Sequence, residues 1–479
     1  MSEQFKKSGE TPVASGKTKE IWAVEGEDKL VIMKNTDATT ADNDASKTQI
    51  MVDKGKCATI TTSRVFELLQ QAGIPTAYVQ QLSDTEVLAK KCIMIPLEVI
   101  IRRHADGSSL DRMPQLKREG PIPYRFHQLK FELFLKTSKG ILEAINLRNY
   151  IPNTHDRLIR YLNAEKTLKD VRERRKKEDK SAPLLVDLYE LSKEELIEEV
   201  IKTIDDPWIE NPYDLDNWVL RHPKKPTWEI PLLTNGPAII DAEKLKEIED
   251  ITRKTFLVLE GAWKTLGYRL IDFKIEFGID ADGSLVVADV IDNDSWRLRT
   301  DDWKELSKQN FRDGHPLKDV QENYVGVAQL ISQITIPKQA IIFWRGSKDD
   351  KLEDFSAVPG IAKEDIVISG HKSPQAAIDT LNELHAKYPE GAVIIAIVGM
   401  SNGLGPMLSA RTPWPVLSYC NTTSTNPEDV WSNLRMPSQV PNATFLSIKN
   451  AHLFALNILS MRNPIAYMER ELAIEKWGN

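Results

Sequence analysis

Cysteines are scarce in this 479-residue sequence, which contains only Cys57, Cys92 and Cys420. The three are far apart and lack the close spacing of metal ligands, so the sequence predicts neither a disulfide framework nor a cysteine metal centre. This usage is typical of a reducing compartment, and we expect a cytoplasmic protein. No apolar run approaches the length of a membrane span, and residues 1–9 are polar and charged, unlike a secretion signal.

A strong charge of one sign is also missing. The 63 basic and 70 acidic residues are mixed along the chain and give a net charge of -7, which lends no electrostatic support to a general nucleic-acid or membrane role. The charged run at residues 169–180 mixes both signs and contains no aromatic residue, so it predicts a solvated helix or loop. The length exceeds what a single core usually serves, and two or three domains are expected.

A predicted hairpin carries the most informative group of charged residues. Residues 272–278 (Asp-Phe-Lys-Ile-Glu-Phe-Gly) and 287–298 (Val-Ala-Asp-Val-Ile-Asp-Asn-Asp-Ser-Trp-Arg-Leu) flank a turn signal, Ala-Asp-Gly-Ser, at 281–284. Pairing of the two strands would bring Glu276 near Asp289, with cationic side chains close by. Carboxylates can hold magnesium, and cations can neutralise phosphate oxygens, so the pattern indicates a magnesium–nucleotide site. A hairpin with charged residues on its wet face is the alternative.

A glycine turn near the start could cover phosphates. Residues 15–20 (Ser-Gly-Lys-Thr-Lys-Glu) precede alternating apolar positions, which predicts a turn within a hairpin. The segment is not a P-loop, because Thr11 stands where the first glycine would be and no helical pattern follows. Without further support, a plain surface turn remains the alternative.

A basic loop follows the predicted strand at residues 94–99. It reads Arg-Arg-His-Ala-Asp-Gly-Ser over residues 102–108. The planar guanidinium group suits a phosphate or a carboxylate, although a solvated loop is the simpler interpretation of these residues alone. We assign no role to His104 or Asp106.

The pattern changes after a predicted boundary near residues 336–338. Continuous apolar runs at 340–344 and 392–398 are each followed by a glycine-containing loop, which predicts a parallel sheet with helices on both faces. Ligands of such sheets bind at the carboxyl ends of the strands. The loop at 403–405 lacks the third glycine of a dinucleotide fingerprint, which argues against a nicotinamide cofactor.

These N-terminal motifs together resemble phosphoribosylaminoimidazole-succinocarboxamide (SAICAR) synthetase, most closely the animal type that is joined to aminoimidazole ribonucleotide (AIR) carboxylase. The resemblance rests on residues 15–20, 96–108, 274–278, 288–298 and 308–313, in the family's order. It implies an α+β, two-lobed, ATP-grasp-like domain over residues 1–336, with a lineage-specific insert at about 137–235. It further implies an ATP-dependent ligase that couples an imidazole carboxylate to aspartate.

The resemblance also implies the site residues of this half. Those implied for ATP are Gly16, Lys17, Lys19, Glu98, Lys274, Glu276 and Asp289. Glu276 and Asp289 would hold Mg²⁺, and Lys274 would also act in catalysis. Those implied for the ribonucleotide and aspartate are Arg102, Ser108, Asp294, Arg297, Lys308 and Arg312.

The C-terminal half resembles AIR carboxylase of the type that uses carbon dioxide directly. The matching pieces are residues 346–350, 369–374, 401–406 and 429–435. They imply a Rossmann-like, three-layer α/β domain with a parallel sheet over 337–479, without biotin or NAD. His371 and Lys372 would act in catalysis, since a histidine can move a proton near neutral pH. Implied substrate-binding residues are Ser347, Asp350, Ser401, Asn402 and Gly403. A homo-octamer through this half is expected.

This half also departs from the family pattern. Asp349 replaces the second serine of Gly-Ser-x-Ser-Asp, Met400 replaces an arginine, and the stretch from 350 to 369 is shorter, so the first helix is expected to be lost or cut down. Two hypotheses follow. The chain is a bifunctional purine-biosynthesis enzyme, or an active synthetase whose carboxylase-like half has become an assembly scaffold. A kinase is disfavoured, because no His-Arg-Asp pattern follows the glycine turn.

Overall fold

The computed structural model describes residues 5–16, 18–40, 48–136, 147–148, 160, 162, 192, 206–223, 225–234, 236–306 and 317–478. The larger part of the predicted insert therefore lies outside the described residues, as do the predicted site residues Lys17, Lys308 and Arg312. The chain divides into two compact units. The first comprises Met1–Thr62, Thr76–Thr252 and Ile271–Tyr324, and the second comprises Ser63–Pro75, Arg253–Leu270 and Val325–Asn479. No described helix is long and apolar enough to cross a membrane.

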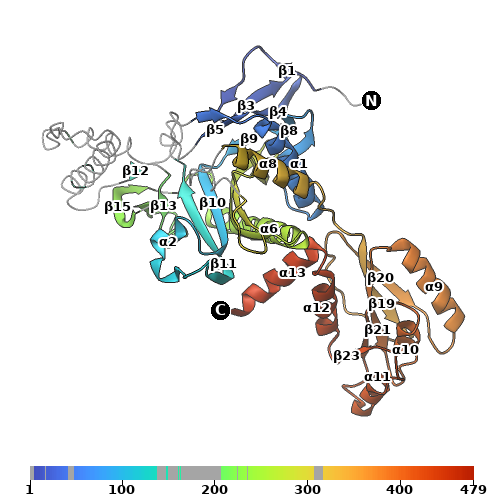
Figure 1. The fold of residues 1–479 in the computed structure, drawn as a ribbon. Coiled ribbons are helices and arrows are strands. Elements are labelled where there is room, and N and C mark those ends of the chain that lie inside the picture. The colour runs from blue at the N-terminus through green and yellow to red at the C-terminus, as the bar shows by residue number, and fades with distance from the viewer. Residues whose placement is uncertain are drawn as a thin grey trace. The chain divides into compact units, whose positions relative to one another are not determined.

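The first unit begins with a six-stranded antiparallel sheet (Figure 1). Its order is β1 (Lys7–Ser8), β3 (Lys19–Val24), β4 (Glu27–Asn35), β8 (Glu86–Lys90) and β7 (Tyr78–Gln81), with β2 (Ala14–Ser15) paired to β3. The pairing of β2 with β3 confirms the predicted hairpin around the glycine turn. Alternate residues of the strands point inward, where Val24, Ile32 and Leu88 form an apolar cluster. A separate pair joins β5 (Ala38–Thr40) to β6 (Thr48–Ile50).

A ten-stranded sheet completes the first unit and carries most of the predicted site residues. Its strands, in spatial order, are β12 (Leu147–Arg148), β15 (Lys225–Thr234), β14 (Trp218–His222), β13 (Trp208–Ile209), β11 (Arg125–Leu135), β10 (Leu97–His104), β16 (Arg269–Asp280) and β17 (Leu285–Ala288). Strands β9 (Cys92–Met94) and β18 (Trp296–Arg299) also pair with β16. The register of β16 and β17 sets Glu276 opposite Ala288, which confirms the predicted hairpin.

Glycine is required at one place in this sheet. A Cβ atom on Gly278 would lie 2.6 Å from Cβ of Cys92, so β9 can approach β16 only because residue 278 has no side chain. Of the helices, α2 (Ser109–Arg112) lies in the first unit, and α1 (Lys54–Gln71), α6 (Ala242–Thr265) and α8 (Leu317–Ile331) each contribute residues to both units.

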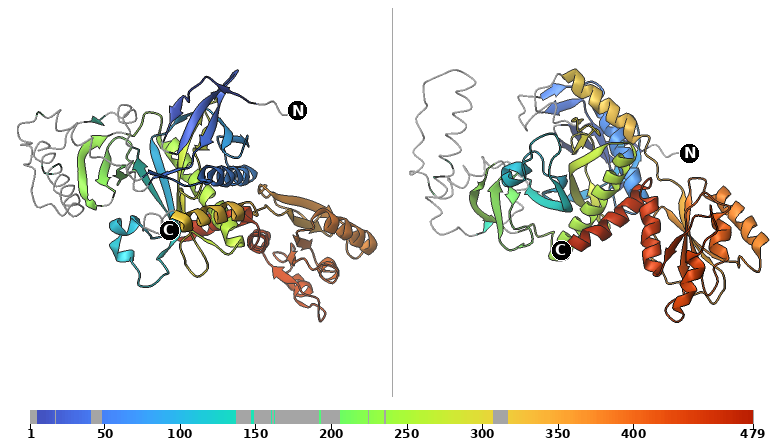
Figure 2. Two further views of the ribbon diagram at one scale, coloured as in Figure 1. Left: turned by 45° about the horizontal axis from the view of Figure 1, so that its top comes forward. Right: turned by 60° about the horizontal axis from the view of Figure 1, so that its bottom comes forward.

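The second unit contains the predicted parallel sheet. Its order is β20 (Ile361–Val367), β19 (Gln339–Arg345), β21 (Ala392–Val398), β22 (Val416–Cys420) and β23 (Ala443–Phe445), with every pair parallel. One face packs against α9 (Pro374–Lys387) and α10 (Leu404–Ser409), and the other against α12 (Ile448–Leu459) and part of α13 (Pro464–Glu475). The orange and red segments of Figure 2 show these layers. Among the described residues, the remaining short helices are α11 (Trp431–Leu434) and the 3₁₀ turns at Pro114–Leu116, Pro427–Val430 and Lys476–Gly478.

The connection from β19 to β20 has no helix. Residues 346–360 are all described, and none of them is helical, which confirms the expected loss of the first helix. The segment instead packs Leu352, Phe355 and Val358 onto the apolar cluster that also contains α12. The ring of Phe355 stacks on Phe343, with centroids 5.2 Å apart. Irregular chain therefore covers the sheet face that a helix would otherwise cover.

The centre of the parallel sheet predicts a stability effect. Ile395 is fully buried on β21, so Ile395→Ala is expected to destabilise the second unit by about 2–5 kcal/mol, and Ile395→Val by about 0.5–1.5 kcal/mol. Scanning calorimetry of the full chain measures both, with Val367→Ala on the exposed edge strand as the control. A shift for Ile395→Ala no larger than that of the control would contradict this account of the core.

Candidate active sites

The first candidate site lies where β3, β10, β16 and β17 approach one another. Lys19 on β3 forms an ion pair with Asp289, which directly follows β17. The backbone of Asp289 has φ of 63°, in the left-handed region, where non-glycine residues are rare and strained. The left-handed backbone at Asp289 directs its carboxylate toward Lys19 on β3. The backbone N–H of the predicted phosphate-binding Gly16 donates to the carbonyl of Lys19 at 2.9 Å.

Two further lysine–carboxylate pairs belong to the same site. Lys136 Nζ lies 2.7 Å from both carboxylate oxygens of Glu276, and Lys274 Nζ donates to Glu98 Oε1 at 2.6 Å. Lys274 and Glu276 alternate along β16 and therefore share one face of the sheet. The site thus holds three lysines and three carboxylates. A polyanion could replace the carboxylates as partner of the lysines, and a divalent cation could replace the lysines as partner of the carboxylates.

Burial changes the proton affinity of this array. Burial lowers the pKa of Lys19 from 10.5 to about 8, and the nearby carboxylates of Glu276 and Asp292 act in the opposite direction. Burial also acts to lower the pKa of Lys274, but the Glu98 carboxylate outweighs it and raises that pKa above its ordinary value. Lys274 therefore stays charged, whereas Lys19 can lose its proton near neutral pH.

A buried lysine that the sequence did not single out holds the predicted substrate residue Asp294. The side chain of Lys54, at the start of α1, is only 2% exposed, and its Nζ lies 3.1 Å from Asp294 Oδ2. The Tyr324 hydroxyl donates to the other oxygen of the same carboxylate. The backbone N–H of Asp294 donates to Asp292 Oδ1 at 2.9 Å. Burial, with the negative charge of Asp294, raises the pKa of Asp292.

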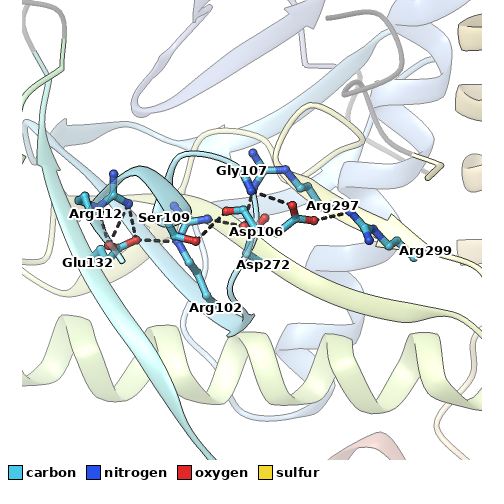
Figure 3. A network of polar contacts seen from close by, with 9 residues as sticks. All are labelled: Arg102, Asp106, Gly107, Ser109, Arg112, Glu132, Asp272, Arg297 and Arg299. Atoms are coloured by element: carbon cyan, nitrogen blue, oxygen red, sulfur yellow. Dashed lines mark hydrogen bonds and ion pairs between the residues drawn. The ribbon is translucent and has the colours of Figure 1, made fainter. Parts of the chain in front are cut away.

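Two of the predicted substrate arginines, Arg102 and Arg297, belong to a second polar network (Figure 3). Arg102 is 2% exposed, and its guanidinium donates to Glu132 and Asp272 rather than opening to solvent. Arg297 donates to the same Asp272 carboxylate at 2.5 Å. The predicted Ser108 is half-buried at the N-cap of α2, where its side chain makes no capping hydrogen bond.

The two loop residues without an assigned role both have contacts. Asp106 forms an ion pair with Arg299, and the ring of His104 meets that of Trp303 edge-on, with centroids 5.5 Å apart. These contacts join the basic loop to the end of β18 and to the segment that follows it. No local motif predicts these two contacts, because the partners lie nearly 200 positions away in the sequence.

The second candidate site forms at the carboxyl ends of β19, β20 and β21, where ligands of parallel sheets bind. Asp350 is buried, and its carboxylate accepts hydrogen bonds from the Ser347 N–H and from Asn421 Nδ2, both at 2.8 Å. A Cβ atom on Gly403 would lie 2.1 Å from Nε2 of His371. The imidazole of His371 therefore lies directly against the loop after β21.

The remaining predicted residues of this site differ in exposure. Asn402 is buried, donates to Ser418 Oγ at 2.9 Å and accepts from the Gly405 N–H at 2.8 Å, so it fixes the loop. Ser401 and Lys372 are exposed. The two departures from the family pattern, Asp349 and Met400, are exposed as well, and Met400 is 75% exposed.

Comparisons with known proteins match both halves. The family model for SAICAR synthetase matches residues 12–168 and 232–331, and that for AIR carboxylase matches residues 349–473. The chain is 30% identical to the "Probable multifunctional protein ADE2" of Caenorhabditis elegans, covering 95% of this chain and 91% of the relative. It is 31% identical to the "Multifunctional protein ADE2" of Gallus gallus, covering 97% and 93%.

Two solved structures represent the structural matches. The phosphoribosylaminoimidazole-succinocarboxamide synthase of Ehrlichia chaffeensis is 22% identical, with a TM-score of 0.43, and the match covers 68% of this chain and 99% of that one. Treponema denticola PurE is 24% identical, with a TM-score of 0.25, and the match covers 29% and 92%.

The lowered pKa of Lys19 predicts a pH dependence for ATP binding. Below pH about 8 Lys19 is charged and attracts phosphate, and above it the attraction is lost, so affinity is expected to fall by about tenfold or more between pH 7 and 9.5. Lys19→Arg should flatten this dependence, because arginine stays charged. Calorimetric titration with a non-hydrolysable ATP analogue measures the affinity at each pH. The control is Lys29→Arg, a substitution at an exposed lysine. An unchanged pH profile in Lys19→Arg would contradict the assignment.

The contact between His371 and Gly403 predicts a selective loss. Gly403→Ala should displace the imidazole and reduce carboxylation of AIR by about a hundredfold, because a shift of about 1 Å can have such an effect. Product formation from AIR and bicarbonate is measured by mass. Gly326→Ala is the control, since nothing lies within 4 Å of the added methyl group. Full activity of Gly403→Ala would show that the His371 position is not critical.

Proposed function

The chain belongs to the family that joins SAICAR synthetase to AIR carboxylase, and from this premise we propose that it is a bifunctional enzyme of purine biosynthesis. The C-terminal half carboxylates AIR with carbon dioxide, as a carboxy-lyase working in the synthetic direction. The N-terminal half, an ATP-dependent ligase, then couples the new carboxylate to L-aspartate. The proposed domains are residues 1–336 and 337–479, with the insert at about 137–235. A homo-octamer through the C-terminal half is part of the proposal and rests on the family resemblance.

The three lysine–carboxylate pairs on β3, β10 and β16 and at the ends of β11 and β17 carry the ligase proposal. A carboxylate is a poor acyl donor, so it must first become an acyl phosphate that an amine can displace. Lys19, Lys136 and Lys274 would offset the charge that builds up on the transferring phosphoryl group. No side-chain nucleophile is needed.

Glu276 and Asp289 fit a magnesium ion. Both supply hard oxygen donors, and magnesium is usually bound through one or two carboxylates together with substrate phosphates. When bound, the ion would neutralise phosphate oxygens. Glu276 would then exchange its contact with Lys136, and Asp289 its contact with Lys19, for the ion.

The position of His371 against the β21 loop carries the carboxylase proposal. The imidazole carbon that takes up carbon dioxide must lose its proton, and His371 would receive it. The buried side chains of Asp350 and Asn402 hold the surrounding loops through hydrogen bonds, while the exposed Ser347 and Ser401 would contact the ribonucleotide. Lys372, next to His371, would add a positive charge.

A two-part assay tests the proposal. The purified chain is given AIR and bicarbonate without ATP, and separately the carboxylated ribonucleotide with ATP, Mg²⁺ and aspartate, and both products are followed by mass. His371→Asn should reduce only the first activity, by about 10²–10⁴-fold. Lys274→Met should reduce only the second, by about 10²–10³-fold.

The outcomes separate the two hypotheses for this chain. Synthetase activity without any ATP-independent carboxylation would identify the C-terminal half as a silent scaffold. Loss of both activities in either single variant would contradict the assignment of two independent sites, because each variant then serves as the other's control.

A further inference from the structure

We propose that Glu132, on β11, is a positioning residue that orients Arg297 and the basic loop at residues 105–109 toward an anionic group of the imidazole ribonucleotide. The inference rests on the proposed ligase function and extends it, because Glu132 is not among the residues to which the resemblance assigns a role. The anionic group is a phosphate or a carboxylate, and both belong to the same substrate.

Glu132 is completely enclosed by guanidinium groups. Its side chain is 2% exposed, and Arg102 Nε donates to Oε2 at 2.6 Å. Arg112, on α2, donates from Nε to Oε1 and from Nη2 to Oε2, both at 2.9 Å. Both carboxylate oxygens accept from guanidinium groups and the side chain is buried, so Glu132 would act on a ligand through the arginines.

The network continues from Glu132 to Arg297 through one shared carboxylate. Arg102 lies opposite Asp272 in the register of β10 and β16, and its Nη1 donates to Asp272 Oδ2. Arg297 Nη1 donates to the same oxygen at 2.5 Å. The chain of contacts Glu132–Arg102–Asp272–Arg297 can be followed in Figure 3.

Arginines outnumber carboxylates in the buried part of this network. Three arginines (Arg102, Arg112 and Arg297) share two carboxylates (Glu132 and Asp272), while the neighbouring Arg299 pairs with Asp106 and Glu305. Although burial acts to raise the pKa of Glu132, the two guanidiniums hold it below its ordinary value, so Glu132 is ionised. The side chains of Arg102 and Arg112 are 3% exposed and that of Arg297 is 16% exposed. Of the three arginines, Arg297 is therefore the one that an anion can reach.

The same network fixes the loop beside Arg297. Gly107 has φ of 55°, and a Cβ atom there would lie 2.3 Å from Arg297 Nη2, so the guanidinium rests against the loop backbone. The loop is tied after this point by Arg112 to Glu132, and before it by Asp106 to Arg299. Glu132 therefore restrains both the loop and the arginine that would share the ligand.

Glu132→Gln in the full chain tests the inference. Glutamine keeps the shape but removes the charge that Arg102 and Arg112 require. The synthetase KM for the carboxylated ribonucleotide is expected to rise about tenfold or more, while the KM for ATP changes less than about threefold, because only ribonucleotide binding depends on Arg297. Glu132→Asp should restore part of the loss. Glu210→Gln is the control, since Glu210 forms an exposed pair with Arg221 on the same sheet.

Two comparisons separate positioning from a general loss of folding. A folding defect would lower kcat for all substrates together, and thermal unfolding would report it directly. Gly107→Ala, which leaves the buried charges intact, should raise the same KM by displacing Arg297.

Use of the riboside, which lacks the phosphate, identifies the anion. A Glu132→Gln defect that disappears with the riboside assigns the phosphate, and one that persists assigns the carboxylate.

The outcomes that would overturn the inference are distinct. An unchanged ribonucleotide KM in both Glu132→Gln and Gly107→Ala, with wild-type turnover intact, would overturn the positioning role alone. A wild-type chain that makes no SAICAR would overturn the proposed ligase function and this inference together. The carboxylase activity of each variant should stay at the wild-type rate, because its residues belong to the second unit.

Discussion

The strand register at the centre of the ten-stranded sheet depends on buried pairs of opposite charges. A buried guanidinium is tolerated only when carboxylates face it, and Arg102 faces two, Glu132 on one neighbouring strand and Asp272 on the other. A slip of one residue in β10 would turn Arg102 toward the apolar core and leave both carboxylates without this partner. The ion pairs therefore specify the register of β10, β11 and β16, and through it the position of every site residue on those strands.

The same alternation separates core from chemistry. On β16, Phe273, Ile275 and Phe277 are buried on one face, and Asp272, Lys274 and Glu276 lie on the other. Asp272 and Glu276 are four residues apart, which corresponds to about 13 Å along a strand. One strand thus supports a lysine-rich end suited to nucleotide phosphates and an arginine-rich end suited to the ribonucleotide.

Local patterns were predictable from the sequence, and pairings between distant residues were not. The hairpin around residues 281–284 and the parallel sheet after residue 338 follow from alternation, apolar runs and turn residues, which are all local signals. The partner of Lys19 is 270 positions away, that of Glu276 is 140 away, and that of Arg102 on β16 is 170 away. Nothing in the sequence distinguishes the buried Arg102 and Lys54 from solvated basic residues. The sequence assigned no role to Lys136, Glu132 or Tyr324, because each of them contacts its partners only when distant strands and helices come together in the fold.

The two residues of the C-terminal half that depart from the family pattern, Asp349 and Met400, affect ligand binding more than proton transfer. Asp349 and Met400 lie on the loops after β19 and β21, whereas His371 lies on the loop after β20, with its imidazole close to Gly403. Both departing side chains are exposed, so solvent and salt screen the change in charge that they bring. The lost helix between β19 and β20 is compensated by Phe355 and its apolar neighbours, which cover the same sheet face. The carboxyl ends of β19, β20 and β21 therefore still converge on one place, and that convergence is what a carboxylase site of this architecture requires.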